Sequence, residues 1–320
     1  MKILAVIVNY KTPDMTLDAI SACLRELAHY PDARVSVVDN DSRDGSYDKL
    51  RSAVADAGWS DRVEVVESDH NGGFAYGNNF AIRPALERAD KPDYVYLLNS
   101  DAFPDTGCIE RLVEFLDAHP EAGIAGSYVH GPEPVPHKTA FRFPTPWSEL
   151  ESTLGLGIVS KLLDRHLVAL PMPEATQQVD WTAAASMLVR REMLDQIGLM
   201  DDGYFLYFEE TDFCLRARRA GWSCWYVVES SVTHIGSVST GYQDRSRPTP
   251  TFWYASRRRY FLDNHGRLTL WAANLAFVAG ALMRRVRYLL TDLQPHEPKR
   301  HLRDFLAFNL RPVSAHPKRD

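Results

Sequence analysis

The chain has 320 residues, of which 45% are hydrophobic and 24% charged, an ordinary globular composition that excludes a disordered or fibrous protein. Its formal net charge of −6 argues against a protein dedicated to nucleic-acid binding, because such proteins are normally basic. The N-terminal apolar run, residues 3–8, is too short for a secretory signal and lacks a cleavage site, so we expect a buried strand there.

The first 120 residues alternate short apolar runs with segments of helical periodicity. This alternation predicts βαβ units and an α/β fold with a mostly parallel central sheet flanked by helices. The expected strands are residues 3–8, 34–38, 62–66 and 94–98, and the expected helices are residues 16–29, 44–57, 74–88 and 106–119. Ligands bind beyond the carboxyl ends of such strands. Polar residues stand at or near these ends: Asn9, Asp39, Asn71 and Asp101.

The pattern becomes less regular after residue 130. Residues 131–146 contain five prolines and predict an irregular loop, and residues 148–163 predict a helix or a mobile flap. Two further strands are expected at residues 179–190 and 222–228, with a helix at residues 209–220 between them.

The C-terminal part of the chain is basic. From Arg257 to the end it has 13 Lys and Arg against 5 Asp and Glu, a net charge of +8 that leaves −14 for the rest. Residues 268–283 are free of charge but shorter than the roughly 20 residues of a spanning helix. Two interpretations stay open: a helix on an anionic membrane surface, or a helix packed against the rest of the chain or a second subunit.

The strongest local signal is the abrupt end of an apolar strand in Asn99, Ser100 and Asp101. A carboxylate there can hold a divalent cation that binds a diphosphate, because Mg²⁺ takes one or two carboxylates together with substrate phosphates. His234, after the last expected strand, is then a candidate second ligand. The alternatives are an Asx turn at Asp101 and an ordinary packed histidine.

Two loops have the composition of a nucleotide site. Residues 37–46 (VVDNDSRDGS) follow the second strand, and Asp39 can accept a hydrogen bond from a base or ribose. Residues 71–79 (NGGFAYGNN) open a helix, where glycines admit a close ligand and the helix start favours phosphate. Plain turn chemistry explains either loop equally well when it is taken alone.

Three carboxylates fall within four positions at the start of the helix expected at residues 209–220: Glu209, Glu210 and Asp212. The helix dipole favours acids there whatever the function. The functional interpretation is a general base, since a carboxylate among aromatic residues and other acids can have a raised pKa. Aromatic residues next to it would give an acceptor sugar apolar faces for stacking: Tyr204, Phe205, Tyr207 and Phe208.

Taken in order, these segments resemble those of the family 2 glycosyltransferases with the GT-A fold, above all the bacterial rhamnosyltransferases of cell-wall and O-antigen assembly. The segments are residues 8–11 (VNYK), 37–46, 71–79, 97–101 (LLNSD), 208–222 (FEETDFCLRARRAGW) and 234–239 (HIGSVS). The resemblance implies a GT-A domain over residues 1–266 and a helical extension over residues 267–320.

The resemblance also implies an inverting transfer from a nucleotide sugar to a saccharide or lipid-linked saccharide. The first choice of donor is dTDP-rhamnose and the second a UDP-hexose. Asp101 corresponds to the metal-binding acid, joined by His234, and the cofactor is Mg²⁺ or Mn²⁺. Glu210 corresponds to the catalytic base, with Glu209 and Asp212 as alternatives because relatives have Asp where Glu210 stands. The implied nucleotide-sugar-binding positions are Asn9, Tyr10, Asp39, Asn71, Gly72, Gly73, Asn78 and Ser100.

The sequence departs from the family pattern at two positions: Glu210 stands where relatives have Asp, and Ala184 replaces a frequent glycine. Asn99 occupies the first position of the D-x-D motif. The scattered cysteines fit a cytoplasmic protein, and the basic tail suits the inner face of the cell membrane. A non-catalytic nucleotide-sugar-binding protein is the alternative class, which the complete set of acids disfavours. A nicotinamide-dependent oxidoreductase would need a glycine fingerprint that the sequence lacks.

Overall fold

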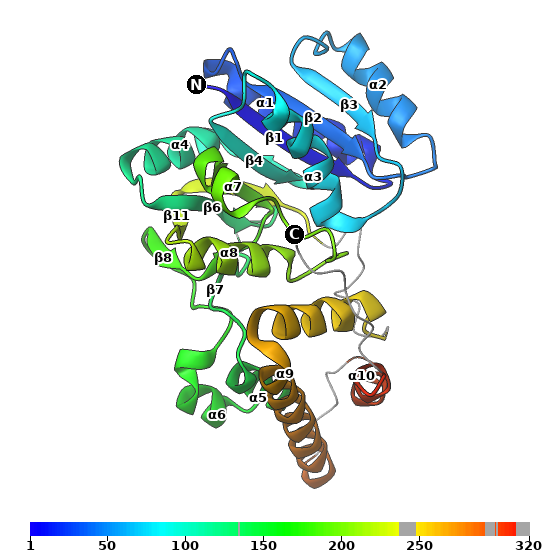
Figure 1. Ribbon diagram of the computed structural model, residues 1–320, viewed down its shortest axis with the longest axis vertical. Helices are drawn as coiled ribbons and strands as arrows, with labels where there is room; N and C mark the ends of the chain where they lie inside the picture. The colour runs from blue at the N-terminus through cyan, green and yellow to red at the C-terminus, as the bar shows by residue number, and fades with distance from the viewer. Residues whose placement is uncertain (134, 237–247, 292–297, 299, 312–320) are drawn as a thin grey trace. The chain divides into compact units, whose positions relative to one another are not determined.

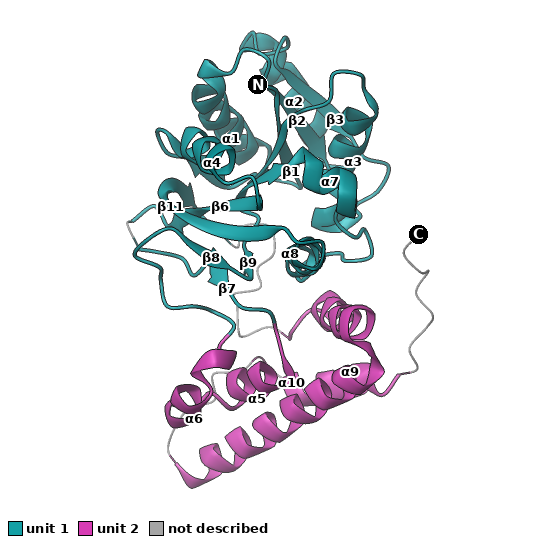
Figure 2. Ribbon diagram, turned by 60° about the vertical axis from the view of Figure 1, so that its left-hand side comes forward, with its two compact units in different colours: residues 1–143, 168–240 teal, residues 144–167, 241–320 magenta. Residues whose placement is uncertain are grey.

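The computed structural model describes residues 1–133, 135–236, 248–291, 298 and 300–311 (Figure 1). The chain divides into two compact units (Figure 2). The sheet unit comprises residues 1–143 and 168–240, and the helical unit comprises residues 144–167 and 241–320. The domain boundary expected after residue 266 falls at a kink inside a long helix and remains a prediction.

The sheet unit is built on a mixed sheet in the order β3-β2-β1-β4-β10-β6-β11-β5, with β8 paired to β11. Its strands are β1 (Ile3–Asn9), β2 (Arg34–Asp39), β3 (Val63–Glu67), β4 (Tyr94–Asn99), β5 (Ala102–Pro104), β6 (Ala122–His130), β8 (Gln177–Val179), β10 (Ser186–Arg190) and β11 (Ser223–His234). A separate pair joins β7 (Ala140–Phe141) to β9 (Trp181–Thr182).

The first four strands confirm the sequence prediction and form the parallel half of the sheet. β1 pairs in parallel with β2 and with β4, and β2 pairs in parallel with β3. The chain therefore moves outward from β1 to β3 and returns to the other side of β1, which creates a topological switch point. Ligands bind at the carboxyl ends of the strands flanking such a point. Here those ends are Asn9 and Asn99.

Helices cover both faces of this sheet (Figure 1). One face packs against α1 (Pro13–Glu26, extended by the 3₁₀ turn Leu27–His29), α2 (Ser46–Asp56) and α4 (Cys108–Ala118). The other packs against α3 (Gly73–Glu87), α7 (Arg191–Ile197) and α8 (Glu209–Arg219). Because β1 is buried on both faces, it reads as a continuous apolar run in the sequence.

Several expected elements differ in the structure. The strand expected at residues 179–190 is broken into β8, β9 and β10, because Asp180 instead accepts hydrogen bonds from Phe143 N and Arg218 Nη1. Beyond β4 the sheet is mixed, since β10 runs antiparallel to both β4 and β6. β6 was not expected, because its many small residues do not form a typical strand pattern. Gly126 must be small, since a Cβ there would lie 2.4 Å from the Thr182 side chain.

The helical unit contains α5 (Pro146–Leu154), α6 (Gly157–Leu162), the 3₁₀ turn Asp164–His166, α9 (Thr251–Leu290) and α10 (His301–Asn309). Residues 148–163 thus form helices, opened by a capping box at Thr145 and Ser148. α9 is kinked at Gly266, whose φ of 82° is non-helical. A Cβ at Gly280 of α9 would lie 2.9 Å from Leu150 O, so glycine allows α9 to pack closely on α5.

Candidate functional site

Asp101 and His234 meet at the carboxyl end of β4. Asp101 follows β4, and His234 ends β11, which pairs with β5 directly after Asp101. His234 Nε2 lies 3.0 Å from Asp101 Oδ1 and 3.3 Å from Asn99 Nδ2. Neighbouring ligands of an octahedral ion with bonds of about 2.1 Å are about 3 Å apart, so the pair fits two positions around Mg²⁺ or Mn²⁺.

Two protein ligands alone do not form a complete metal centre. Within the part of the chain that the structure describes, no cluster of three or more His, Cys, Asp or Glu residues is suited to a metal ion. Mg²⁺ usually keeps several waters and binds substrate phosphates beside one or two carboxylates. The donor set at Asp101 and His234 therefore fits an ion completed by a diphosphate. Ser237 and Ser239 of the segment after His234 lie outside the described residues.

Asn9 and Asp39 form a buried polar pair at the ends of β1 and β2. Asn9 Nδ2 donates to Asp39 Oδ1 at 2.6 Å, and Thr16 Oγ1 donates to Asn9 Oδ1 at 2.8 Å. Ser42 donates to both oxygens of Asp39, from Oγ at 2.6 Å and from its backbone N at 3.1 Å. These contacts shape the loop after β2, and nucleotide contact by Asn9 and Asp39 remains a prediction.

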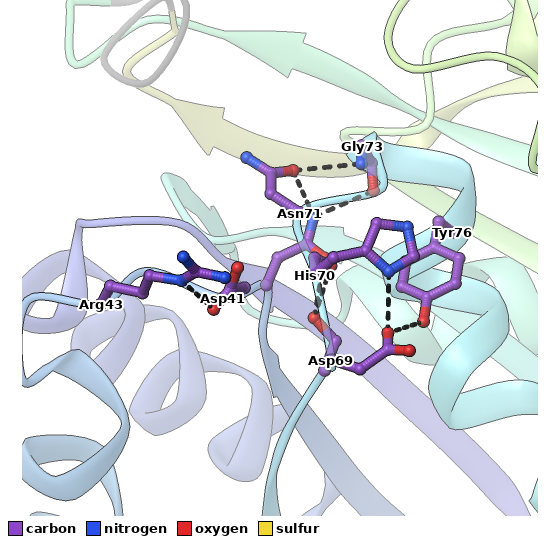
Figure 3. Close-up of polar contacts among 9 residues, drawn as sticks. Asp41, Arg43, Asp69, His70, Asn71, Gly73 and Tyr76 are labelled. Atoms are coloured by element: carbon purple, nitrogen blue, oxygen red, sulfur yellow. Dashed lines mark hydrogen bonds and ion pairs between the residues drawn. The ribbon is translucent and has the colours of Figure 1, made fainter.

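Asn40 connects this loop to the glycine loop, residues 71–79, and this connection is not evident from the sequence pattern. Its Nδ2 donates to Asn71 Oδ1 and to Gly73 O, both at 3.0 Å. Asn71 Oδ1 in turn accepts a hydrogen bond from Gly73 N at 3.1 Å (Figure 3). The signal was present in the VVDN segment, because an asparagine directly after a buried strand often bonds to neighbouring backbone.

The glycine loop continues into an aromatic and acidic cluster. Asp69 accepts hydrogen bonds from Tyr76 Oη and His70 Nδ1, and the His70 and Tyr76 rings lie 4.4 Å apart (Figure 3). The hydrogen bond from Tyr76 and then the one from His70 lower the pKa of the Asp69 carboxyl. A Cβ at Gly72 would lie 2.4 Å from the Tyr76 ring, so this packing requires glycine.

Gly73 locks the glycine loop onto the segment that precedes α8. Its φ is +88°, and a Cβ there would lie 1.7 Å from Phe205 O. The same carbonyl accepts a hydrogen bond from Phe74 N at 2.9 Å. Between Phe205 and α8, both Tyr207 and Phe208 have positive φ, 66° and 68°, a conformation unusual for aromatic residues and common at functional sites. The expected nucleotide loop therefore touches the segment that carries the expected base.

The three carboxylates of α8 have different surroundings. Asp212 is fully buried and bound by Arg216 Nε at 2.9 Å, while the Arg216 guanidinium also donates to Ile197 O and Leu199 O. Asp212 is thus held in a structural ion pair, and Arg216 joins α8 to the end of α7 and the residues after it. The geometry therefore favours Glu209 or Glu210, rather than Asp212, as a carboxylate free to act on a substrate.

Glu209 and Glu210 lie in a poorly solvated environment. Among the described residues, Glu209 Oε2 and Glu210 Oε2 are buried without a hydrogen-bond partner. Burial raises the pKa of Glu210 to about 7, and burial followed by the Glu210 charge raises the pKa of Glu209 well above its usual value. A carboxylate with a pKa near neutrality suits general base catalysis.

Ser100, Asn78 and Tyr10 are the remaining expected site residues, and their surroundings are as follows. Ser100 is buried, with its Oγ 3.4 Å from Thr12 Oγ1. Asn78 Nδ2 donates to Phe74 O inside α3, so that amide serves its own helix. Tyr10 is half-buried, with Lys11 Nζ 5.1 Å from its ring centre. The structure brings the end of β4 together with His234, and the glycine loop together with the aromatic segment before α8.

Comparison with known proteins agrees with this architecture. A family model described as glycosyl transferase family 2 matches residues 4–163, half of the chain. The chain is 26% identical to an N-acetylglucosaminyl-diphospho-decaprenol L-rhamnosyltransferase of Mycobacterium tuberculosis, over 75% of this chain and 78% of the relative. It is 28% identical to the rhamnosyltransferase WbbL of Escherichia coli, over 51% of this chain and 60% of that protein.

A solved structure shares the fold. It is a mannosyltransferase from Pyrobaculum calidifontis, PcManGT, in complex with GDP-Man and Mn²⁺. The TM-score is 0.59 at 14% sequence identity, and the match covers 96% of this chain and 79% of that one. At this identity the likeness shows the α/β fold.

Proposed function

The chain belongs to glycosyltransferase family 2, and from this premise we propose that it transfers L-rhamnose from dTDP-rhamnose to a saccharide or lipid-linked saccharide with inversion. The donor is proposed from the likeness to two rhamnosyltransferases. The lipid-linked acceptor is proposed from the name of the mycobacterial relative, which acts on a diphospho-decaprenol substrate. A cytoplasmic location follows as part of the same proposal.

The observation that carries the proposal is the contact between Gly73 and Phe205. Residues 71–79, the loop proposed to bind the nucleotide, contact Phe205, which precedes Glu209 and Glu210 by a few residues. A donor held by that loop would therefore lie beside buried carboxylates. Alignment of a nucleophile with its reaction partner is a main source of rate enhancement in transfer reactions.

In the proposed mechanism Glu210 acts as the general base. Its carboxylate takes the proton of the acceptor hydroxyl as that oxygen attacks the anomeric carbon, and the bond to the donor diphosphate breaks on the opposite side. No covalent enzyme intermediate is needed for inversion. Asp101 and His234 would hold Mg²⁺ or Mn²⁺, and the ion would supply positive charge to stabilise the leaving diphosphate.

A panel of nucleotide sugars tests the donor. The full-length protein, with Mn²⁺ and a polyprenyl diphospho-sugar acceptor, is incubated with dTDP-rhamnose and with UDP-hexoses, and products are identified by mass. We expect a mass increase of one deoxyhexose with dTDP-rhamnose and none in Glu210→Gln. Transfer from a UDP-hexose alone would replace the donor proposal, and binding without transfer or hydrolysis of any donor would favour a non-catalytic binding protein.

We further propose that the helical unit contacts the membrane. Among the described residues, α9 is the one helix whose length and composition suffice to cross a bilayer. Beyond Gly266 it exposes a row of large apolar side chains: Leu268, Trp271, Leu275, Leu282 and Leu289. Basic residues next to an apolar helix face favour anionic lipid, and residues 257–320 carry a net charge of +8.

Flotation with phosphatidylglycerol vesicles at low salt tests the membrane contact. The full-length protein should float, and Leu275→Asp should float less, because it places a charge in the centre of the exposed row. A matched change on a half-buried polar residue of the same helix, Thr269→Asp, lies outside that row and should have a smaller effect. If the wild-type protein stays at the bottom and sediments as a dimer, the row is a subunit interface instead.

A further inference from the structure

Three consecutive arginines of α9 are buried in the helical unit. Arg257 is 0% exposed, Arg258 9% and Arg259 6%. Two of them have anionic partners: Arg257 Nε lies 3.0 Å from Glu149 Oε2, and Arg259 Nε lies 3.5 Å from Asp263 Oδ2. A buried cation is normally retained only with such a partner.

Arg258 differs from its two neighbours. Within the described residues its Nε and Nη1 are buried without a hydrogen-bond partner, and no carboxylate forms an ion pair with it. Its guanidinium lies 4.3 Å from the centre of the Phe308 ring of α10. Burial lowers the pKa of Arg258, as expected for a desolvated cation. The ring compensates part of this loss, but ring contact does not use the N–H donors in the guanidinium plane.

Unused N–H donors on a guanidinium held over an aromatic ring are suited to an oxyanion. Guanidinium forms two parallel hydrogen bonds to phosphate, and such charge-assisted bonds are among the strongest in proteins. We propose that Arg258 binds a phosphate group of a lipid, either the diphosphate of a polyprenyl-linked acceptor or the headgroup of an anionic phospholipid.

The same helix supplies the reason for a lipid rather than a free anion. α9 carries the exposed apolar row from Leu268 onward, so a ligand with a phosphate group and an acyl or prenyl chain matches both features of one helical unit. The acceptor alternative rests on the proposed function. The phospholipid alternative does not, and separate probes distinguish the two.

Calorimetric titration of the full-length protein tests the proposal. The probes are geranyl diphosphate, geraniol, inorganic diphosphate and phosphatidylglycerol vesicles. Arg258→Met keeps an apolar stem against Phe308 and removes the donors, while Arg303→Met, at an exposed arginine of α10, is the matched control. We expect Arg258→Met to weaken binding of geranyl diphosphate or of the vesicles about 10- to 100-fold, the usual effect of losing a charge-assisted hydrogen bond, and Arg303→Met to change it little.

The four probes identify the source of the phosphate. Dependence on Arg258 for geranyl diphosphate supports the acceptor, and dependence for the vesicles alone supports the phospholipid headgroup. Equal affinity for inorganic and geranyl diphosphate contradicts a lipid ligand. Equal binding by Arg258→Met and the wild type, for every probe, overturns the proposal.

Thermal unfolding without ligand supplies an independent readout. Removing a buried charge that has no partner should leave Tm unchanged or raise it. Arg257→Met should instead lower Tm, because it leaves the buried Glu149 carboxylate without its cationic partner. An unfolded Arg258→Met variant would therefore contradict the premise that its charge is uncompensated. Hydrolysis of dTDP-rhamnose by the wild type reports on the proposed function separately, since it needs no acceptor.

Discussion

Replacing Glu210 by Gln removes the proposed base while keeping the shape of the side chain. A positioned general base typically contributes 10²- to 10⁴-fold to the rate, which corresponds to about 3–5 kcal/mol of transition-state stabilisation. We therefore expect kcat for sugar transfer to fall by this factor in Glu210→Gln. Binding of dTDP, measured by calorimetry, should change little because the expected nucleotide contacts come from other segments.

The pH dependence follows from the same residue. Because the pKa of Glu210 is raised to about 7, the carboxylate is available only above that pH. Below it, kcat/KM of the wild type should fall about tenfold for each pH unit. The residual activity of Glu210→Gln should lack this limb, since glutamine does not titrate in the range.

Protein stability supplies a second test, because the raised pKa of Glu210 makes stability fall as the pH rises, whereas it makes activity rise. The pKa of Glu210 in the folded chain, about 7, lies above its ordinary value of 4.5. Between these values the folded state holds a proton that the unfolded state has lost, so the free energy of unfolding falls as the pH rises. The cost reaches about 3 kcal/mol above pH 7 and is absent below pH 4.5. Glu210→Gln should therefore raise Tm at pH 8 and leave it unchanged at pH 4.5.

Rates are followed by dTDP release and by product mass between pH 5.5 and 8.5, with Glu209→Gln as the matched neighbour. The reasoning is refuted if Glu209→Gln is inactive while Glu210→Gln works. A kcat/KM that is flat below pH 7 would show that Glu210 is ionised throughout, and its burial would then not determine its role.

Three further predictions concern the metal pair, the glycine loop and the ion pair of α8. Asp101→Ala should abolish Mn²⁺-dependent transfer at unchanged Tm, and full activity of that variant in EDTA would show that no metal acts there. Gly73→Ala should impair both folding and transfer, because its Cβ meets Phe205 O, whereas Gly107→Ala, with a similar positive φ and open space, should cost only about 1 kcal/mol in denaturant unfolding. Asp212→Asn should lower the free energy of unfolding by about 3–5 kcal/mol, because it leaves the partly buried Arg216 without its anionic partner. A fully stable but inactive variant would instead indicate a catalytic role.

The strands β1 to β4 and their helices could be predicted from the sequence because each depends on local periodicity. β1 and β4 are buried on both faces and therefore appear as unbroken apolar runs. The order of β10 and β6 could not be predicted in this way. Their pairing joins residues far apart in the chain, and the small residues of β6 hide a strand whose side chains must leave room for Thr182.

The residue types of the candidate site are visible in the sequence, but their roles depend on tertiary contacts. Asp101 and His234 are 133 positions apart, and the pairing of β11 with β5 brings them together. Glu209, Glu210 and Asp212 look equivalent in a helical pattern, yet among the described residues only Asp212 has an arginine partner, the half-buried Arg216. The sequence by itself determines where polar groups follow apolar strands. The tertiary structure decides which of them lose water and which gain a partner, because desolvation and ion pairing depend on neighbours that are distant along the chain.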